Sequence, residues 1–349
     1  LKLHVDNPAG YDALEAAINA ARRSIWFETF MWHNDASGQR FAKLLARRKL
    51  DGLDVRVLVD PLGTSSDRDV LRPMLDAQVP VRFYRQRVLG SLENITHRKL
   101  YLMDGWRGFT GGMNIGDPYL HWHDLLVDVQ GPAARDMHRV FSEDWNVSGA
   151  PDIDVDKAPA LQSRYGVSKV RPLKTDMSGD HDGRDLIAAQ LAAFKSARKS
   201  IRTAQLFLSD DEVLDHLEIA ARRGVETKVL VSERNNMGVF RELNKHNAAR
   251  LRKAGVQFRF YHDRTSHMKY VSVDGAWLML GSANGDTRSY QTNQEFSLGI
   301  SDLDFVAEAD RRVFDADFAA SRIPSDAELK VSWTKKPVVL LADWLSILL

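Results

Sequence analysis

Two histidine–lysine pairs in this chain have the residue types and the spacing needed to handle a phosphate group. In the first, His97 and Lys99 are separated by one residue, and Asp104 follows after four more. The same types recur at the same spacing as His267, Lys269 and Asp274. An imidazole can attack or move a proton, and an ammonium is a point charge for a phosphate oxygen. The two copies therefore predict a phosphoryl-transfer site with His97, Lys99, His267 and Lys269 as catalytic residues.

Small residues and an asparagine follow each motif. Gly112 and Asn114 stand after the first copy, and Ser282 and Asn284 stand at the same spacing after the second. A glycine lets the backbone approach a ligand closely, and an asparagine adds an amide donor. We expect these four residues to contribute to phosphate binding.

A carboxylate lies at a matched distance beyond each histidine. Asp124 follows His97 by 27 residues and Glu295 follows His267 by 28, each at the head of an apolar, strand-like run. A carboxylate that accepts from imidazole Nδ1 would fix the tautomer and leave Nε2 free to react. We predict that Asp124 and Glu295 orient the two histidines.

The aspartates of the two motifs allow two interpretations. Asp104 and Asp274 each precede a glycine, which is typical of a tight hairpin turn, and a catalytic role is the alternative. Residues near the motifs that could line an acceptor site are Tyr119, His121, Arg288 and Tyr290. Other histidines, His138 among them, show no paired spacing and are assigned no role.

The elements that must position these residues also occur twice. Three segments recur in the same order at offsets between 172 and 177 residues: 21–25 as 197–201, 55–59 as 227–231, and 81–84 as 258–261. A repeat of this length indicates tandem duplication of a whole domain rather than a solenoid of short units.

Within each copy, helical and strand patterns alternate. In the first copy, 14–21 has the spacing of a buried helical stripe, 25–31 reads as a buried strand, 41–48 as helix and 55–59 as strand. This order predicts an α/β fold of two halves, each with a mostly parallel or mixed sheet flanked by helices. The predicted boundaries are 1–150 for the first half, 151–182 for a linker, 183–325 for the second half and 326–349 for a C-terminal tail.

Composition limits the classes of protein. The 349 residues include no cysteine, so neither disulfides nor thiolate metal sites are available. The formal net charge of +1 gives no support for a nucleic-acid partner. No apolar run is long enough to span a bilayer. The apolar segment 338–349 is compatible with an amphipathic helix on a membrane surface or with a helix docked on the protein's own core.

At these residues the sequence resembles the phospholipase D superfamily, whose signature is two His-x-Lys-x4-Asp motifs. The resemblance covers nearly the whole chain and implies two halves related by a pseudo-twofold axis that share one site. It implies that one histidine forms a phosphohistidine and the other protonates the leaving alcohol, with no metal and no cofactor. His97 then corresponds to the nucleophile and His267 to the general acid and base, although the symmetric motifs allow the exchange. In the family the motif aspartate is more often structural than catalytic.

Within the superfamily the chain looks most similar to bacterial cardiolipin synthases, through 111–119 and through 281–295. One departure is His123, which stands where those enzymes often have an arginine beside the carboxylate. The resemblance implies transfer of a phosphatidyl group from phosphatidylglycerol to a second lipid alcohol. A hydrolytic phospholipase D, or a nuclease or other phosphodiesterase with the same site, is the alternative. The expected partner is a phospholipid at the cytoplasmic membrane, bound peripherally; the residues give no indication of oligomeric state.

Overall fold

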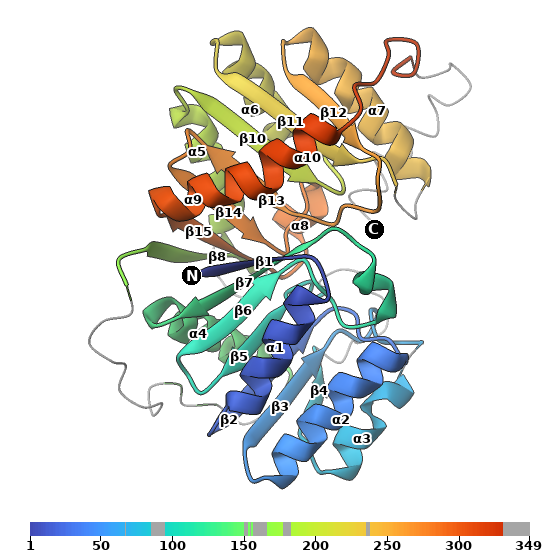
Figure 1. The fold of residues 1–349 in the computed structure, drawn as a ribbon, viewed down its shortest axis with the longest axis vertical. Helices are drawn as coiled ribbons and strands as arrows, with labels where there is room; N and C mark the ends of the chain where they lie inside the picture. Colours follow the sequence, from blue (N-terminus) through green and yellow to red (C-terminus); the bar gives the residue numbers. More distant parts are fainter. Residues whose placement is uncertain are drawn as a thin grey trace. The chain divides into compact units, whose positions relative to one another are not determined.

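Two α/β units make up the chain, Leu1–Val167 and Ser168–Leu349, and each is described by itself. The computed structural model describes residues 1–66, 68–84, 95–149, 153, 155, 166–176, 183–234 and 238–330. Figure 1 shows that each unit has a twisted sheet with helices packed against it.

The first unit contains a seven-stranded mixed sheet in the order β1-β7-β6-β5-β2-β3-β4. Its strands are β1 (Lys2–Val5), β2 (Ser24–Thr29), β3 (Asp54–Val59), β4 (Val81–Phe83), β5 (Leu100–Met103), β6 (Arg107–Gly111) and β7 (Leu125–Gln130). β2, β3 and β4 are parallel, and the remaining pairs are antiparallel. Its helices are α1 (Ala9–Ala20), α2 (Ala36–Leu50), α3 (Arg72–Asp76) and α4 (Pro132–Val147), with short 3₁₀ turns at Arg68–Leu71 and Asp117–Leu120.

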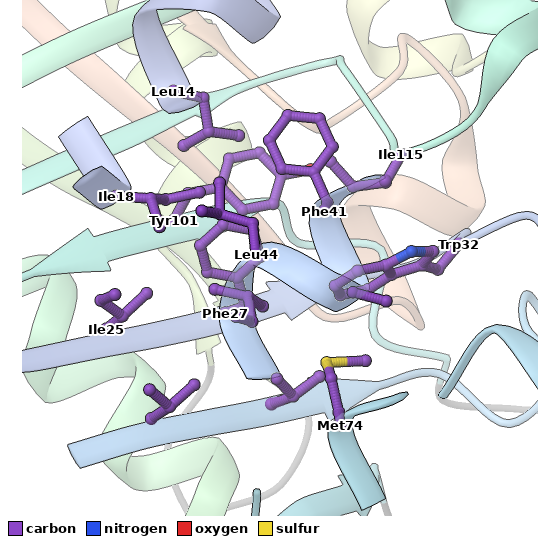
Figure 2. Packing of buried hydrophobic residues seen from close by; sticks show 14 of the residues in the cluster. Leu14, Ile18, Ile25, Phe27, Trp32, Phe41, Leu44, Met74, Tyr101 and Ile115 are labelled. Carbon is purple, nitrogen blue, oxygen red and sulfur yellow. The ribbon is translucent and has the colours of Figure 1, made fainter. Parts of the chain in front are cut away.

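The side chains of β2 show how helices come to cover both faces of this sheet. Alternate residues of a strand point to opposite faces. Ile25 and Phe27 are fully buried in the core that α1 and α2 form on one face, as Figure 2 shows. Trp26 points to the other face, where its ring lies 5.4 Å from that of Phe141 on α4. Each large apolar side chain buried in this way contributes about 1.5–3 kcal/mol.

The second unit repeats this arrangement. Its eight-stranded sheet has the order β12-β11-β10-β13-β14-β15-β8-β9. The strands are β8 (Lys169–Asp176), β9 (Gly183–Arg184), β10 (Ser200–Gln205), β11 (Glu226–Ser232), β12 (Gln257–Tyr261), β13 (Tyr270–Val273), β14 (Trp277–Gly281) and β15 (Glu295–Ser301). The helices are α5 (Asp185–Ser196), α6 (Asp211–Arg222), α7 (Gly238–Lys253), α8 (Thr287–Gln291), α9 (Leu303–Ala309) and α10 (Ala316–Ala320), with a π-helical segment at Asp310–Asp315.

Apart from β9, which has no counterpart in the first sheet, the two sheets correspond strand for strand. β10, β11 and β12 are parallel like β2, β3 and β4, and the antiparallel run β13-β14-β15-β8 corresponds to β5-β6-β7-β1. The predicted fold class, two α/β halves with mixed sheets flanked by helices, is confirmed. The order of strands in each sheet also agrees with duplication of a whole domain.

The predicted linker at 151–182 needs correction, because it includes strand β8. β8 pairs with β15 along seven residues and so belongs to the second sheet, in the position that β1 holds in the first. Pro172 lies in this strand, and the strand tolerates it because on its other side β8 pairs with β9 only at Thr175 and Asp176. The second unit therefore starts before residue 183.

The C-terminal tail falls mostly outside the described residues, which end at Lys330. Of the described part, Leu329 is buried and belongs to the core of the second unit. None of the helices in the described ranges is long and apolar enough to cross a membrane.

Candidate active site

Each His-x-Lys motif lies in the segment that leads directly into the first strand of a hairpin. His97 and Lys99 precede β5, and His267 and Lys269 precede β13. All four side chains are buried, with Lys99 fully enclosed and His97 8% exposed. Lys99 Nζ donates to the carbonyl of His97 at 2.6 Å, and Lys269 Nζ donates to that of His267 at 2.7 Å. The two motifs therefore adopt the same local conformation, with each ammonium beside its histidine.

A hydroxyl or carboxylate at the carboxyl end of a parallel strand fixes the start of each motif. The backbone amide of Thr96 donates to Asp60 Oδ2 at 2.9 Å, just beyond β3. In the second unit the amide of Ser266 donates to Ser232 Oγ at 2.9 Å, at the end of β11. The residue before each histidine is thus tied to the carboxyl end of the same strand of the sheet.

The motif aspartates close the same turn in both units. Asp104 and Asp274 have left-handed backbones, with φ of 57° and 54°, at the hairpins β5–β6 and β13–β14. Asp104 accepts hydrogen bonds from the amides of 22–24, and Asp274 accepts them from those of 198–200. Each carboxylate ties its hairpin to the residues that enter β2 or β10. This bonding supports a structural role for both aspartates.

The predicted phosphate-binding asparagines follow β6 and β14. Asn114 is buried, and its Oδ1 accepts from the amide of Met31 at 3.2 Å. Its carbonyl accepts from the Tyr11 hydroxyl at 2.7 Å. Asn284 is buried too, and within the described part of the chain its Oδ1 has no hydrogen-bond partner. A buried polar atom of this kind is costly unless a bound group satisfies it.

Gly112 and Ser282 lie against the predicted orienting carboxylates. A Cβ on Gly112 would be 2.2 Å from Asp124 Oδ1, so only glycine fits there without a shift. At the matching position of the second unit, the Ser282 hydroxyl donates to Glu295 Oε2. The sheet register establishes this match, because Gly111 pairs with Leu126 and Gly281 pairs with Ser297. The longer carboxylate is therefore paired with the residue that carries a hydroxyl.

A buried charged network under the first motif was not predicted. Arg98, between His97 and Lys99, is fully buried and forms an ion pair with Asp144 of α4. Glu28 of β2 is also fully buried and accepts from the Thr96 hydroxyl. Burial raises the pKa of Glu28 well above its ordinary value, and the charge of Asp144 raises it further. The ionised form of Glu28 is therefore disfavoured in the folded protein.

A second residue without a predicted role is His138 of α4. It is buried, its Nδ1 lies 2.8 Å from the carbonyl of Ala134, and its Nε2 accepts from the amide of Gly105 at 3.2 Å. Burial lowers the pKa of His138 to about 4, so the ring is neutral and supports the turn that follows Asp104. No paired spacing could have revealed it, because its partner is a backbone amide.

The residues expected to line an acceptor site differ in their exposure. His121 is exposed, whereas Tyr119 is buried with its hydroxyl 3.0 Å from His33 Nε2. Tyr290 is fully buried, and its hydroxyl donates to Gln190 of α5, which makes it a core residue of the second unit. Arg288 is buried and donates from Nε to Asn293 at 3.2 Å. Among the described residues, no group of three or more His, Asp or Glu side chains could hold a metal ion.

An α/β unit present twice, with a His-x-Lys motif entering the same hairpin in each copy, defines a phospholipase D-like protein. A family model described as the phospholipase D-like domain of cardiolipin synthase matches residues 14–145 and 191–317. The chain therefore belongs to this family, whose members are enzymes of the phosphatidyltransferase or phosphodiesterase type.

Individual relatives agree with this assignment. Cardiolipin synthase A of Pseudomonas entomophila is 31% identical over 92% of this chain and 69% of its own length. Cardiolipin synthase of Listeria monocytogenes is 27% identical over 88% of this chain and 66% of its own length. The chain thus spans about two thirds of these relatives. A crystal structure of phosphatidylserine synthase from Haemophilus influenzae has the same fold, with a TM-score of 0.74 over 99% of this chain and 93% of that one, at 15% identity.

Proposed function

We propose that the protein is a cardiolipin synthase-like phosphatidyltransferase that uses a phosphohistidine intermediate. The observation that supports this most is that both half-sites are complete, with a buried histidine, lysine and asparagine in equivalent places of two units. A protein that only binds lipid has no need to keep two intact sets of reactive groups. The similarity to cardiolipin synthases over most of the chain favours a phospholipid as the substrate.

In the first step, Nε2 of His97 attacks the phosphorus of phosphatidylglycerol. The N–P bond forms, the bond from phosphorus to the glycerol headgroup breaks, and His267 gives its proton to the departing glycerol oxygen. Lys99, Lys269 and the two asparagines stabilise the charge on the phosphate oxygens. Asp124 and Glu295 hold the imidazoles in the reactive tautomer.

In the second step, a hydroxyl of another phosphatidylglycerol replaces the histidine. His267 removes the proton of that hydroxyl, the new O–P bond forms and the N–P bond breaks. Two phosphatidylglycerols thus give cardiolipin and glycerol, and one diester is exchanged for another without an energy source. The equivalence of the half-sites allows the two histidines to exchange roles. Water in place of the second lipid would make the enzyme a hydrolytic phospholipase D.

Such a substrate requires access to the surface of a membrane, and we propose peripheral association with the cytoplasmic membrane. The nuclease alternative has less support, because a formal net charge of +1 provides no general attraction to a polyanion.

Product analysis by mass spectrometry tests the proposal. The protein is incubated with phosphatidylglycerol vesicles in EDTA, together with His97→Ala, His267→Ala and the surface control His216→Ala. His216 is a fair control because its Nδ1 lies 2.7 Å from a carbonyl of its own helix, at Glu212. We expect cardiolipin and glycerol from the wild type and the control only. Phosphatidic acid without cardiolipin would identify a hydrolase, and no lipid turnover would reject the proposed substrate.

A further inference from the structure

Asp6 has an unusual backbone conformation at a position with no predicted function. It follows β1 and has φ of 63°, in the left-handed region that is rare for residues other than glycine. Aspartate tolerates this region better than most residues, yet the conformation is still unfavourable. Strain of this kind persists where the surrounding contacts require it, so the contacts of Asp6 are informative.

Three hydrogen bonds join Asp6 to two residues more than a hundred positions away. Its amide donates to the carbonyl of Asp124 at 2.9 Å, and its Oδ1 accepts from the amide of Asp124 at 3.0 Å. The same Oδ1 lies 2.6 Å from Nδ1 of His123, which is 4% exposed. The peptide groups on both sides of Asp124 are thus held by a single residue.

The Asp124 side chain has little freedom once its backbone is held. Its Oδ1 accepts from the amide of Leu125 at 2.8 Å, and both carboxylate oxygens lie close to Gly112. Two residues that follow Asp6 also donate hydrogen bonds to the backbone near the site. Asn7 donates to the carbonyl of Tyr119 at 3.0 Å, and Tyr11 donates to that of Asn114. The segment from Asp6 to Tyr11 therefore holds the loops that carry two of the predicted site residues, Asn114 and Asp124.

In the second unit, the residue that matches Asp6 makes different contacts. Thr175 pairs with Glu295 in the sheet and so takes the place of Asp6, but its hydroxyl donates to the carbonyl of Ser289 at 3.1 Å. The residue matching His123 is Gln294. The carboxylate–imidazole contact is therefore specific to the first half-site, where His123 stands in place of an arginine.

We infer that Asp6 is a positioning residue for the first half-site: through His123 and the backbone of Asp124 it places the carboxylate that orients His97. This inference rests on the proposed role of Asp124. Asp6 is not one of the groups proposed to react, so its loss should lower the turnover rate and leave substrate binding largely unchanged. Any replacement that keeps an acceptor at Oδ1 should preserve most of the effect.

Asp6→Gly is the informative variant, because glycine adopts the left-handed backbone freely but provides no acceptor. Asp6→Asn keeps both the acceptor and the tolerance of positive φ. The matched control is Gln78→Gly, since Gln78 has φ of 57° after α3. Hydrolysis of bis(p-nitrophenyl) phosphate gives kcat and KM for any phosphodiester site, and hydrogen exchange of 122–130 reports whether the Asp124 backbone is held.

We expect Asp6→Gly to lower kcat about tenfold with little change in KM, since small misplacements of catalytic groups have large effects on rate. Exchange at 122–130 should rise in the same variant. The kcat of Asp6→Asn should stay within about threefold of the wild-type value. The control Gln78→Gly should match the wild type in both kcat and hydrogen exchange. If Asp6→Gly fails to fold, His123→Gln replaces it, because the second unit has glutamine at this position. His123→Gln should lower kcat by less than the roughly tenfold expected for Asp6→Gly and leave KM unchanged.

The inference would be overturned if Asp6→Gly kept the wild-type kcat and the wild-type hydrogen exchange. It would also be overturned if Asp6→Asn lost as much kcat as Asp6→Gly. A wild type that cleaves the synthetic diester but makes no cardiolipin would count against the proposed function only. If the wild type cleaves neither substrate, exchange at 122–130 decides whether Asp6 holds this segment.

Discussion

Gly112 and Asp124 are in such close contact that a Cβ on Gly112 would lie 2.2 Å from Asp124 Oδ1. The two residues come from neighbouring strands, since Gly112 follows β6 and Asp124 precedes β7. The contact leaves the carboxylate no room to move toward Gly112. Glycine is therefore required here by packing against a proposed catalytic partner, and not by a left-handed backbone.

Gly112→Ser should displace the Asp124 carboxylate. His97 would then lose the group proposed to fix its tautomer and its orientation. We expect kcat to fall about 100-fold with the fold retained, because displacement of such a group by about 1 Å can cost that much. Steady-state hydrolysis of a phosphodiester and thermal unfolding would measure both effects. Wild-type kcat in Gly112→Ser would show that Asp124 does not act on His97.

The second unit provides a matched comparison for this prediction. Ser282 donates its hydroxyl to Glu295, so Ser282→Gly removes one hydrogen bond and creates no clash. We expect kcat of Ser282→Gly to fall only about threefold to tenfold. Combining Gly112→Ser with Asp124→Glu reproduces the pair of the second unit and should recover part of the activity.

A different prediction concerns the buried ion pair of Arg98 and Asp144. In the second unit Met268 stands at the position of Arg98. Arg98→Met leaves the Asp144 carboxylate buried without its cation and should cost about 3–5 kcal/mol in the free energy of unfolding. Arg98→Met with Asp144→Leu removes both charges and should recover most of that loss. Urea unfolding at pH 7 measures the free energy of unfolding of both variants. If Arg98→Met were as stable as the double variant, an unpaired Asp144 would cost nothing and the prediction would be wrong.

The sequence predicted the parts of the site that are repeated or that follow from strand order. The motif residues, the asparagines and the small residues beside the carboxylates recur at fixed spacing, so comparing the halves was sufficient to propose them as site residues. The hairpin turns at Asp104 and Asp274 followed from the Asp-Gly pairs. The alternation of helix and strand likewise gave the α/β class, because side-chain periodicity is a local property of the chain.

The contacts that distinguish the halves could not be predicted in this way. Asp6 meets Asp124, and Arg98 meets Asp144, through the folding of distant segments onto one another. No periodicity reports which buried charge will meet which. β8 was missed for a related reason, since the sequence around it is polar and contains Pro172, while its place in the sheet comes from pairing with β15.

The aspartate of the second motif should contribute stability that depends on pH. Burial alone would raise the pKa of Asp274, but hydrogen bonds from the amides of Ser200, Lys199 and Arg198 outweigh it and lower the pKa. A lowered carboxyl pKa stabilises the fold above the ordinary value, and the contribution is lost as the pH falls through the folded-state value. Asp274→Asn should therefore cost about 1–3 kcal/mol at pH 7 and progressively less in acid.

Urea unfolding between pH 3 and pH 7 would measure this effect. Asp263→Asn is the control, because the Asp263 side chain is 77% exposed. Asparagine also tolerates the left-handed backbone of Asp274, so strain does not confuse the comparison. A constant difference between wild type and Asp274→Asn at every pH would contradict the prediction.

Asp286, which caps α8, should show the opposite dependence. It precedes α8 and accepts from the amide of Ser289 at 2.8 Å. Burial raises its pKa from 3.8 to about 6; the Ser289 amide opposes the rise, and the charge of Glu295 adds to it. The protonated form is therefore favoured in the folded state. The contribution of protonated Asp286 to the stability of the fold is complete below about pH 3.8 and is lost as the pH rises through about 6.

Asp286→Asn removes the cost of this buried charge and keeps an acceptor for the helix cap. A rise from 3.8 to about 6 corresponds to about 3 kcal/mol, so the variant should gain up to that amount at pH 7 and little below pH 3.8. Asp302, which caps α9, is the matched control. Hydrogen bonds from Ser168 and Phe305 lower its pKa, so Asp302→Asn should lose about 1 kcal/mol at pH 7. If both variants shifted the free energy of unfolding in the same direction at pH 7, burial would not be the force acting on Asp286.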